Sequence, residues 1–242
     1  MSPSPLVYYD QFKQVLDDYH LSPRALKTLK TLHFAPLLGP TSVGRNTLIN
    51  HLVKTGSYYY IISDTTRKPE IRDGQLEQDG VQYFFRSEPE ILADLKAGEF
   101  LEAEIIHNQQ VSGISIRELE RAAKTNKTAV TDIELGGITN ILAIKPDAVA
   151  IMLLPPSFEE WQNRINSRGT MPEDDYMRRM HTALRIFESG LEQDHYNFVI
   201  AEDVDESVNI INSVVNGGPS PHQERAKILL KTLCQETKKV IH

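Results

Sequence analysis

From Phe34 onward, the chain alternates short apolar runs with longer amphipathic stretches. Several of these runs have the length and composition of strands: FAPLL, YYYIIS, VQYFF, TAVTDI, AVAIMLL and YNFVIA. Parallel strands need a long crossover connection, usually a helix, so strands that alternate with helical stretches are typical of a parallel sheet. The pattern predicts an α/β fold with a mainly parallel sheet core flanked by helices.

Both ends of the chain have helical patterns that lie outside this alternation. Apolar residues recur at helical spacing between Pro5 and about Tyr19, and Ser22 and Pro23 have the residue types of an N-cap and a first turn. Residues 1–33 are therefore predicted as an added helical hairpin. Residues 216–242 are predicted as a linker, NGGPSP, and one amphipathic helix. We expect the terminal helices to pack on the core or to mediate self-association, which leaves a monomer and a homodimer open.

The composition argues against several classes of partner. A net charge of −7 at pH 7 disfavours binding to a nucleic acid polymer, which needs a broad basic face. No segment approaches the roughly 18 apolar residues of a membrane span, and the first residues do not read as a secretory signal, so we expect a cytoplasmic protein. Small anions remain expected partners, because arginines cluster in one short region: Arg164, Arg168, Arg178, Arg179 and Arg185.

The stretch GPTSVGRN, residues 39–46, lies between the first predicted strand and a helix. A glycine-rich turn at a helix N-terminus aims backbone N–H groups at a phosphate, and Gly39 and Gly44 suit that role. The usual phosphate-binding loop has a lysine and a hydroxyl after its second glycine, whereas this chain has Arg45 and Asn46. Arginine keeps the positive charge but presents a larger, planar fork. The motif alone predicts phosphate binding, with a plain strand-to-helix turn as the alternative.

A set of segments carries a resemblance to a known family: GPTSVGRNTL, ISDTTRKP, DGVQYFF, GEFLEAEIIH, TDIELGG and SRGTMPEDDYMRRMHTAL. In order and approximate spacing they resemble guanylate kinase, over roughly Phe34 to Val215. The resemblance implies a P-loop kinase fold for residues 34–215, with a small GMP-binding subdomain at about 62–115 and a helical lid at about 157–190. It also implies the activity, which is transfer of the γ-phosphoryl group of ATP to GMP with Mg2+.

On the GMP side, the resemblance assigns the acceptor phosphate to three residues: Ser63, Arg67 and Tyr83. Glu70 occupies the place of a second phosphate-binding arginine in the family. Arg72 lies two residues on and is expected to substitute for it if the loop bends back.

The guanine base is assigned to Glu102, which matches a carboxylate of the family. A carboxylate can accept the adjacent N1–H and N2 amino donors of guanine as a bidentate pair, and adenine has no such pair. Ile114 occupies the position of a hydroxyl that closes the guanine pocket, so Ser115 is expected to supply that hydroxyl after a one-residue shift. Glu102 also has a plain interpretation, as a surface charge in a glutamate-rich stretch.

On the ATP side, the resemblance assigns the phosphates to the loop and the first turn of its helix: Gly39, Ser42, Gly44, Arg45, Asn46 and Thr47. Catalysis is assigned to four cations that would hold the transition state: Arg45, Arg164, Arg168 and Arg179. Asp132 is expected to act through magnesium-bound water, with no direct protein ligand to the metal. Ala201 occupies the place of an asparagine that faces adenine in the family, which leaves the donor nucleotide open.

Two functions of different classes follow. The first is an active nucleoside monophosphate kinase that acts on GMP. The second is a catalytically degenerate module of the same fold that binds a nucleotide or a protein partner. The kinase is favoured by the retained Arg67, Glu102, Asp132 and lid arginines. The degenerate module is favoured by Arg45, Asn46, Ile114 and Ala201.

Overall fold

The computed structural model describes residues 5–72, 74–106, 108–167, 169 and 171–242, and the chain divides into two compact units. The sheet unit comprises Phe34–Tyr58, Val130–Leu142 and Asp147–His242. The hairpin unit comprises Met1–His33, Tyr59–Ala129 and Ala143–Pro146. Over the described residues, every helix is too short or too polar to span a membrane.

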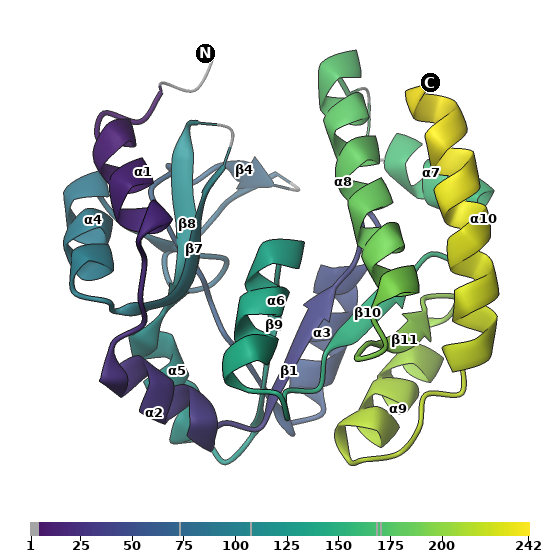
Figure 1. The fold of residues 1–242 in the computed structure, drawn as a ribbon, viewed down its shortest axis with the longest axis horizontal. Coiled ribbons are helices and arrows are strands. Elements are labelled where there is room, and N and C mark those ends of the chain that lie inside the picture. Colours follow the sequence, from purple (N-terminus) through teal and green to yellow (C-terminus); the bar gives the residue numbers. More distant parts are fainter. Residues whose placement is uncertain (1–4, 73, 107, 168, 170) are drawn as a thin grey trace. The chain divides into compact units, whose positions relative to one another are not determined.

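The larger sheet has its strands in the order β11-β10-β1-β9-β2 (Figure 1). Their bounds are Phe34–Leu38 for β1, Tyr58–Tyr60 for β2, Thr128–Asp132 for β9, Ile151–Leu154 for β10 and Asn197–Ile200 for β11. β10 pairs in parallel with both β1 and β11. Every residue of β1 and β10 is buried, as expected for parallel strands covered on both faces. The predicted α/β fold with a parallel sheet core is confirmed.

The helices of the sheet unit follow its strands in the expected alternation: α3 Arg45–Lys54, α6 Leu135–Ile144, α7 Phe158–Asn166, α8 Glu173–Glu192, α9 Val204–Val215 and α10 Gln223–Ile241. α8 and α10 run side by side (Figure 1). The predicted linker before α10 is fixed rather than loose: Ser220 donates its hydroxyl hydrogen to the Phe198 carbonyl, and His222 Nδ1 accepts from the Ile200 amide at 3.0 Å. These bonds tie the C-terminal segment to β11.

The hairpin unit has a second sheet with the strand order β6-β3-β8-β7. Its strands are β3 Asp64–Thr65, β6 Phe84–Phe85, β7 Phe100–Ile106 and β8 Gln110–Ser115, and a separate pair joins β4 Ile71–Arg72 to β5 Gln75–Leu76. The long antiparallel hairpin β7–β8 was missing from the sequence-based strands, because FLEAEII and QVSGIS alternate polar with apolar residues and look less hydrophobic than buried parallel strands. Of the predicted strand VQYFF, only Phe84–Phe85 is extended.

The N-terminal helices are α1 Tyr9–Asp17 and α2 Pro23–Thr31. The predicted cap is confirmed, because the Ser22 hydroxyl accepts from the Ala25 amide at 3.2 Å and Pro23 opens the helix. The predicted helical hairpin is corrected, since the two helices pack on different partners. α1 lies against α4 Glu88–Lys96 and β7, and α2 lies against α5 Ile116–Ala123 (Figure 1).

Candidate active site

The glycine loop connects β1 to α3 within the sheet unit. Gly39 cannot carry a side chain, because a Cβ there would lie 2.9 Å from the Leu153 carbonyl oxygen of β10. Gly44 has φ of 106° and caps α3 from the left-handed region, and Ser42 also has a positive φ of 60°. Positive φ values of this kind turn successive amides toward one concave side, which is the geometry of a phosphate nest. Among the described residues, the amides of Ser42 and Gly44 have no protein acceptor.

Arg45 opens α3 and is held by a weak partner. Its Nη1 lies 4.0 Å from Glu134 Oε1, and the Glu134 side chain is 51% exposed. A contact of this length between a cation and a solvated carboxylate contributes little, so the guanidinium can turn toward an anion at little cost. Asn46 and Thr47 follow in the first turn of α3, and both are exposed. The helix dipole adds to the attraction for phosphate at this end.

Two lid arginines are bonded to the loop or to the strand end beside it. Arg179 of α8 donates from Nη1 to the Thr41 hydroxyl at 2.8 Å. Arg164 of α7 donates from Nη2 to the Ala201 carbonyl at 3.0 Å and from Nη1 to the Val43 carbonyl at 3.4 Å. The buried Trp161 indole also donates to the Thr41 carbonyl, at 2.7 Å, and fixes α7 on the loop. Arg168 lies outside the described residues.

The other donor-side positions lie at the same ends of the strands. Asp132 is the last residue of β9, and the next amide, of Ile133, donates to the Leu37 carbonyl of β1 at 3.0 Å. Asp132 is therefore next to the strand that leads into the glycine loop. Ala201 follows β11, and its amide donates to the Leu154 carbonyl of β10 at 2.8 Å. Parallel strands that end together in this way form the usual place for a nucleotide in open α/β sheets.

On the acceptor side, Arg67 of the hairpin unit is held by buried Glu77. The guanidinium Nη1 and Nη2 donate to the two carboxylate oxygens at 2.5 and 2.8 Å, and Nη1 also donates to the Lys68 carbonyl. The Tyr83 ring centroid lies 4.9 Å from the guanidinium carbon. Burial acts to lower the pKa of Arg67, but the bonds to Glu77 and the charge of Glu70 raise it overall. Arginine has five N–H donors, and these three bonds leave two of them without an acceptor among the described residues.

The remaining predicted GMP residues lie on or directly before different strands of the hairpin unit. The Ser63 carbonyl accepts from the Phe84 amide, which fixes Ser63 beside β6. Glu102 lies on β7 opposite Ile114 of β8. Ser115 does not share this cross-strand position, because it lies opposite Phe100, is buried, and donates its hydroxyl to Asp64 at 3.4 Å. The side chain of Arg72 lies outside the described part of the chain.

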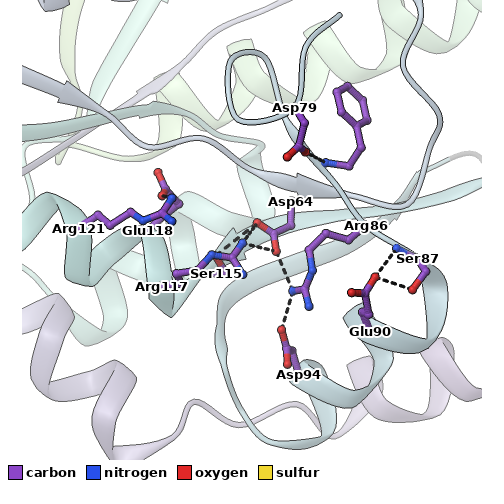
Figure 2. Close-up of polar contacts among 11 residues, drawn as sticks. Asp64, Asp79, Arg86, Ser87, Glu90, Asp94, Ser115, Arg117, Glu118 and Arg121 are labelled. Carbon is purple, nitrogen blue, oxygen red and sulfur yellow. Dashed lines mark hydrogen bonds and ion pairs between the residues drawn. The ribbon is translucent and has the colours of Figure 1, made fainter.

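Sequence reasoning missed a buried ionic cluster around Asp64, which Figure 2 shows between two arginines. Arg86 Nη1 donates to Asp64 Oδ2 at 3.0 Å and to Asp94 at 2.6 Å, and Arg117 Nη2 donates to both Asp64 oxygens at 2.9 and 3.0 Å. Burial raises the pKa of Asp64, and the arginines act against the rise. Glu77 was missed as well. Asp64 directly follows the apolar run YYYIIS, which is the signal that could have found it, whereas Glu77 in QLEQ follows a single leucine and has no such signal.

The sheet unit thus has the features of a phosphate-binding α/β protein: a glycine loop at the end of a parallel strand, a helix N-terminus and convergent arginines. In the part of the chain that the structure describes, no three His, Cys, Asp or Glu side chains group as metal ligands.

Comparison with known proteins gives the family. The family model described as guanylate kinase matches residues 34–217. The guanylate kinase of Corynebacterium diphtheriae is 36% identical over 183 residues, which cover 75% of this chain and 93% of the relative. Guanylate kinase 1 of Arabidopsis thaliana is 30% identical over 167 residues, 68% of this chain and 42% of the relative. The chain belongs to the guanylate kinase family, and α1, α2 and α10 lie outside the matched region.

A solved structure supports the fold. The crystal structure of guanylate kinase from Anaplasma phagocytophilum matches with a TM-score of 0.56 and 22% sequence identity, covering 76% of this chain and 84% of that chain. At this identity the likeness concerns the fold, which agrees with the P-loop kinase fold expected from the sequence.

Proposed function

We propose that this chain transfers the γ-phosphoryl group of ATP to GMP, giving ADP and GDP. The observation that carries the proposal is the convergence of α7 and α8 on the glycine loop. Trp161 and Arg179 both bond to Thr41, and Arg164 bonds to Val43 two residues on. A module that only bound a partner would not need two lid helices whose arginines reach the phosphate loop.

The chemistry requires positioning and positive charge more than a base. The attacking atom is a phosphate oxygen of GMP that already carries negative charge, so no proton has to be removed by a strong base. Arg45, Arg164 and Arg179 supply the charge that neutralises the transferred group. Arg164 and Arg179 are bonded to carbonyl and hydroxyl oxygens of the sheet unit, which orient these two guanidinium groups. Arg164 also donates from Nε to the exposed Glu160 carboxylate at 3.1 Å, so Arg179 is the better example of a cation held by a neutral partner.

The oxygens near the loop fit magnesium. Mg2+ prefers oxygen ligands and usually keeps several waters, and when bound with ATP it neutralises the β- and γ-phosphates. The amide oxygen of Asn46 and the hydroxyl of Thr47 are exposed in the first turn of α3, and the carboxylate of Asp132 ends the strand beside β1. We assign Asp132 to the water of the ion, and Asn46 and Thr47 to the phosphates of ATP.

We assign the GMP phosphate to the two N–H donors of Arg67 that bond to no described residue, with Ser63 four positions earlier in the chain. Tyr83, whose ring lies beside the Arg67 guanidinium, and Arg72, as the second cation, complete the set. Glu102 accepts the guanine N1–H and N2 amino donors. Ser115 is the least supported member of the set, because its hydroxyl is bonded to Asp64. The proposal therefore gives Glu102 the main part in choosing guanine.

The test is a turnover assay with purified protein, ATP and Mg2+, in which GMP, dGMP, AMP, CMP and UMP are compared as acceptors. We expect diphosphate formation with GMP and dGMP and far slower formation with the others. Calorimetry with GMP is run in parallel. Binding of GMP without turnover of any acceptor at high enzyme concentration would show a degenerate module and overturn the kinase proposal.

A companion variant, Arg45→Lys, tests the altered loop directly. The long guanidinium and the compact ammonium reach the phosphates from different positions. Since the proposed site places the Arg45 guanidinium on the phosphates, we expect a lower kcat for the lysine variant. A higher kcat would mean that Arg45 weakens an otherwise ordinary phosphate loop.

A further inference from the structure

The N-terminal extension, residues 5–33, is bonded along the outer edge of β7. β7 is the end strand of its sheet, so one side of its backbone faces away from β8. The Leu6 amide donates to the Asn108 carbonyl, just beyond the end of β7, at 3.3 Å. The Ser22 amide donates to the Gly98 carbonyl, just before the start of β7, at 3.2 Å. The extension therefore spans the length of the strand.

Tyr19 makes the central contact. Its hydroxyl accepts from the Phe100 amide at 2.8 Å and donates to the Phe100 carbonyl at 2.6 Å. One phenol thus satisfies the two backbone groups that a neighbouring strand would otherwise bond. Burial raises the pKa of Tyr19 to about 12, so the hydroxyl remains a donor at every ordinary pH.

The position that Tyr19 holds is the one that sets the direction of Glu102. The register of the β7–β8 pair shifts between Phe100 and Glu102. An irregularity of this kind re-aims the side chains that follow it, and a slip of one residue would turn them to the other face of the sheet. Fixing Phe100 on its outer side therefore limits where the Glu102 carboxylate can point.

The extension is anchored firmly enough to act in this way. The Glu88 carboxylate of α4 accepts from the amides of Val7 and Tyr8, at 3.2 and 2.9 Å, directly before α1. Leu6 and Phe12 are buried in a cluster with α4 and with Phe100 itself. A negative charge at a helix N-terminus and a shared apolar core both stabilise the docked position.

We propose that the N-terminal extension is a positioning element for the purine site, in which Tyr19 fixes the start of β7 and thereby the aim of Glu102. The inference rests on the proposed role of Glu102 at guanine. Tyr19 acts through the backbone of β7, so it is a positioning residue and has no assigned contact with the nucleotide.

The test compares the affinities of the full chain for GMP and IMP by calorimetry, which needs no phosphoryl transfer. IMP lacks the N2 amino group, so the GMP to IMP affinity ratio reports on the bidentate hydrogen bonds that the Glu102 carboxylate would accept from guanine. For Tyr19→Phe we expect the ratio to fall about fivefold, because the ring stays but both hydrogen bonds are lost. Tyr9→Phe is the matched control: Tyr9 packs on the same cluster, and no bond of its hydroxyl is recorded among the described residues.

A double-mutant cycle with Glu102→Gln identifies the route. We expect Glu102→Gln to lower the ratio, and Tyr19→Phe to change it no further in that background. The inference is overturned if Tyr19→Phe leaves the GMP to IMP affinity ratio unchanged. It is also overturned if Tyr19→Phe lowers this ratio equally in the unaltered chain and in the Glu102→Gln variant. If Glu102→Gln leaves the GMP to IMP affinity ratio unchanged, the assignment of Glu102 to guanine is wrong and the inference fails with it. A loss of turnover without a change in this ratio bears only on the kinase proposal. If Tyr19→Phe does not fold, Glu88→Gln loosens the same segment from its far end and should lower the ratio about twofold.

Discussion

The two units differ in the partners of Arg164 and Arg179, on one side, and of Arg67 and the arginines around Asp64, on the other. In the sheet unit, Arg179 bonds to a hydroxyl and Arg164 to two carbonyl oxygens, besides an exposed glutamate. In the hairpin unit, Arg67 bonds to buried Glu77, and the pair around Asp64 likewise joins arginines to a fully buried carboxylate. Neutral partners orient a cation and keep its charge for a ligand. Buried carboxylates neutralise much of the charge of the arginine, and the ion pair stabilises the fold instead of a bound ligand. The proposed donor side thus keeps more of its positive charge for phosphate, and the proposed acceptor side is built first to be rigid.

The largest effect should come from removing the loop cation. Arg45→Met should lower kcat about a thousandfold, because a well-placed cation in a phosphoryl-transfer site is worth that much or more. The affinity for GMP, measured by calorimetry, should stay close to that of the unaltered chain. Lys54→Met, at the far end of the same helix, is the control and should leave kcat unchanged. A loss of less than tenfold in Arg45→Met would place the phosphates out of reach of this residue.

Asp64→Asn should lower the stability of the protein strongly and leave ATP binding at the donor site nearly unchanged. Two arginines lose a fully buried counterion, which costs about 3 kcal/mol. For a chain of this size that lowers Tm by about 6 to 12 °C. Thermal unfolding followed by circular dichroism measures it. The control is Asp194→Asn, which removes an exposed carboxylate from Lys227 and should leave Tm unchanged. An equal drop in Tm for Asp64→Asn and Asp194→Asn would contradict the view that buried carboxylates hold the hairpin unit together.

A smaller effect, on rate alone, is expected from Thr41→Val. The change removes the hydroxyl that accepts from Arg179 while the loop backbone and the side-chain shape stay nearly the same. A hydrogen bond to a charged group is worth about 1.5 kcal/mol, so kcat should fall about tenfold with Tm almost unchanged. Thr139→Val, in α6, is the control for loss of a hydroxyl. If Tm falls and kcat does not, the hydrogen bond between Arg179 and Thr41 stabilises the fold and does not position the lid arginine for catalysis.

The smallest effect concerns alkaline stability and compares one tyrosine from each unit. Burial raises the pKa of Tyr19 and of Tyr58 from 10 to about 12, and Tyr58 donates to Asn212 at 2.7 Å. Because the unfolded chain ionises first, this stabilisation is complete below pH 10 and is lost as the pH rises toward about 12. Urea unfolding at pH 8 and pH 11 should therefore show a smaller drop for Tyr19→Phe and for Tyr58→Phe than for the unaltered chain. If a variant loses as much unfolding free energy between pH 8 and pH 11 as the unaltered chain does, the tyrosine replaced in it has an ordinary pKa in the folded protein.

Much of the sheet unit could be predicted from the sequence, because its elements are local and strongly patterned. The run FAPLL is β1 residue for residue, and Gly39 and Gly44 mark the loop. The hairpin unit was harder to predict. Its strands are short or half polar, and its site residues pair across β7–β8 and β3–β8, which no local pattern encodes.

The sequence by itself determined the α/β class, the phosphate loop and the family, since these depend on residue types at fixed short spacings and on the order of the segments. Only the tertiary structure decided which partner holds each arginine, that Ser115 is bonded to Asp64, and that the N-terminal extension is bonded along β7. The physical reason is distance along the chain: Tyr19 and Phe100 are separated by 81 positions, and hydrogen bonds and ion pairs over such separations exist only once the core has brought their elements together.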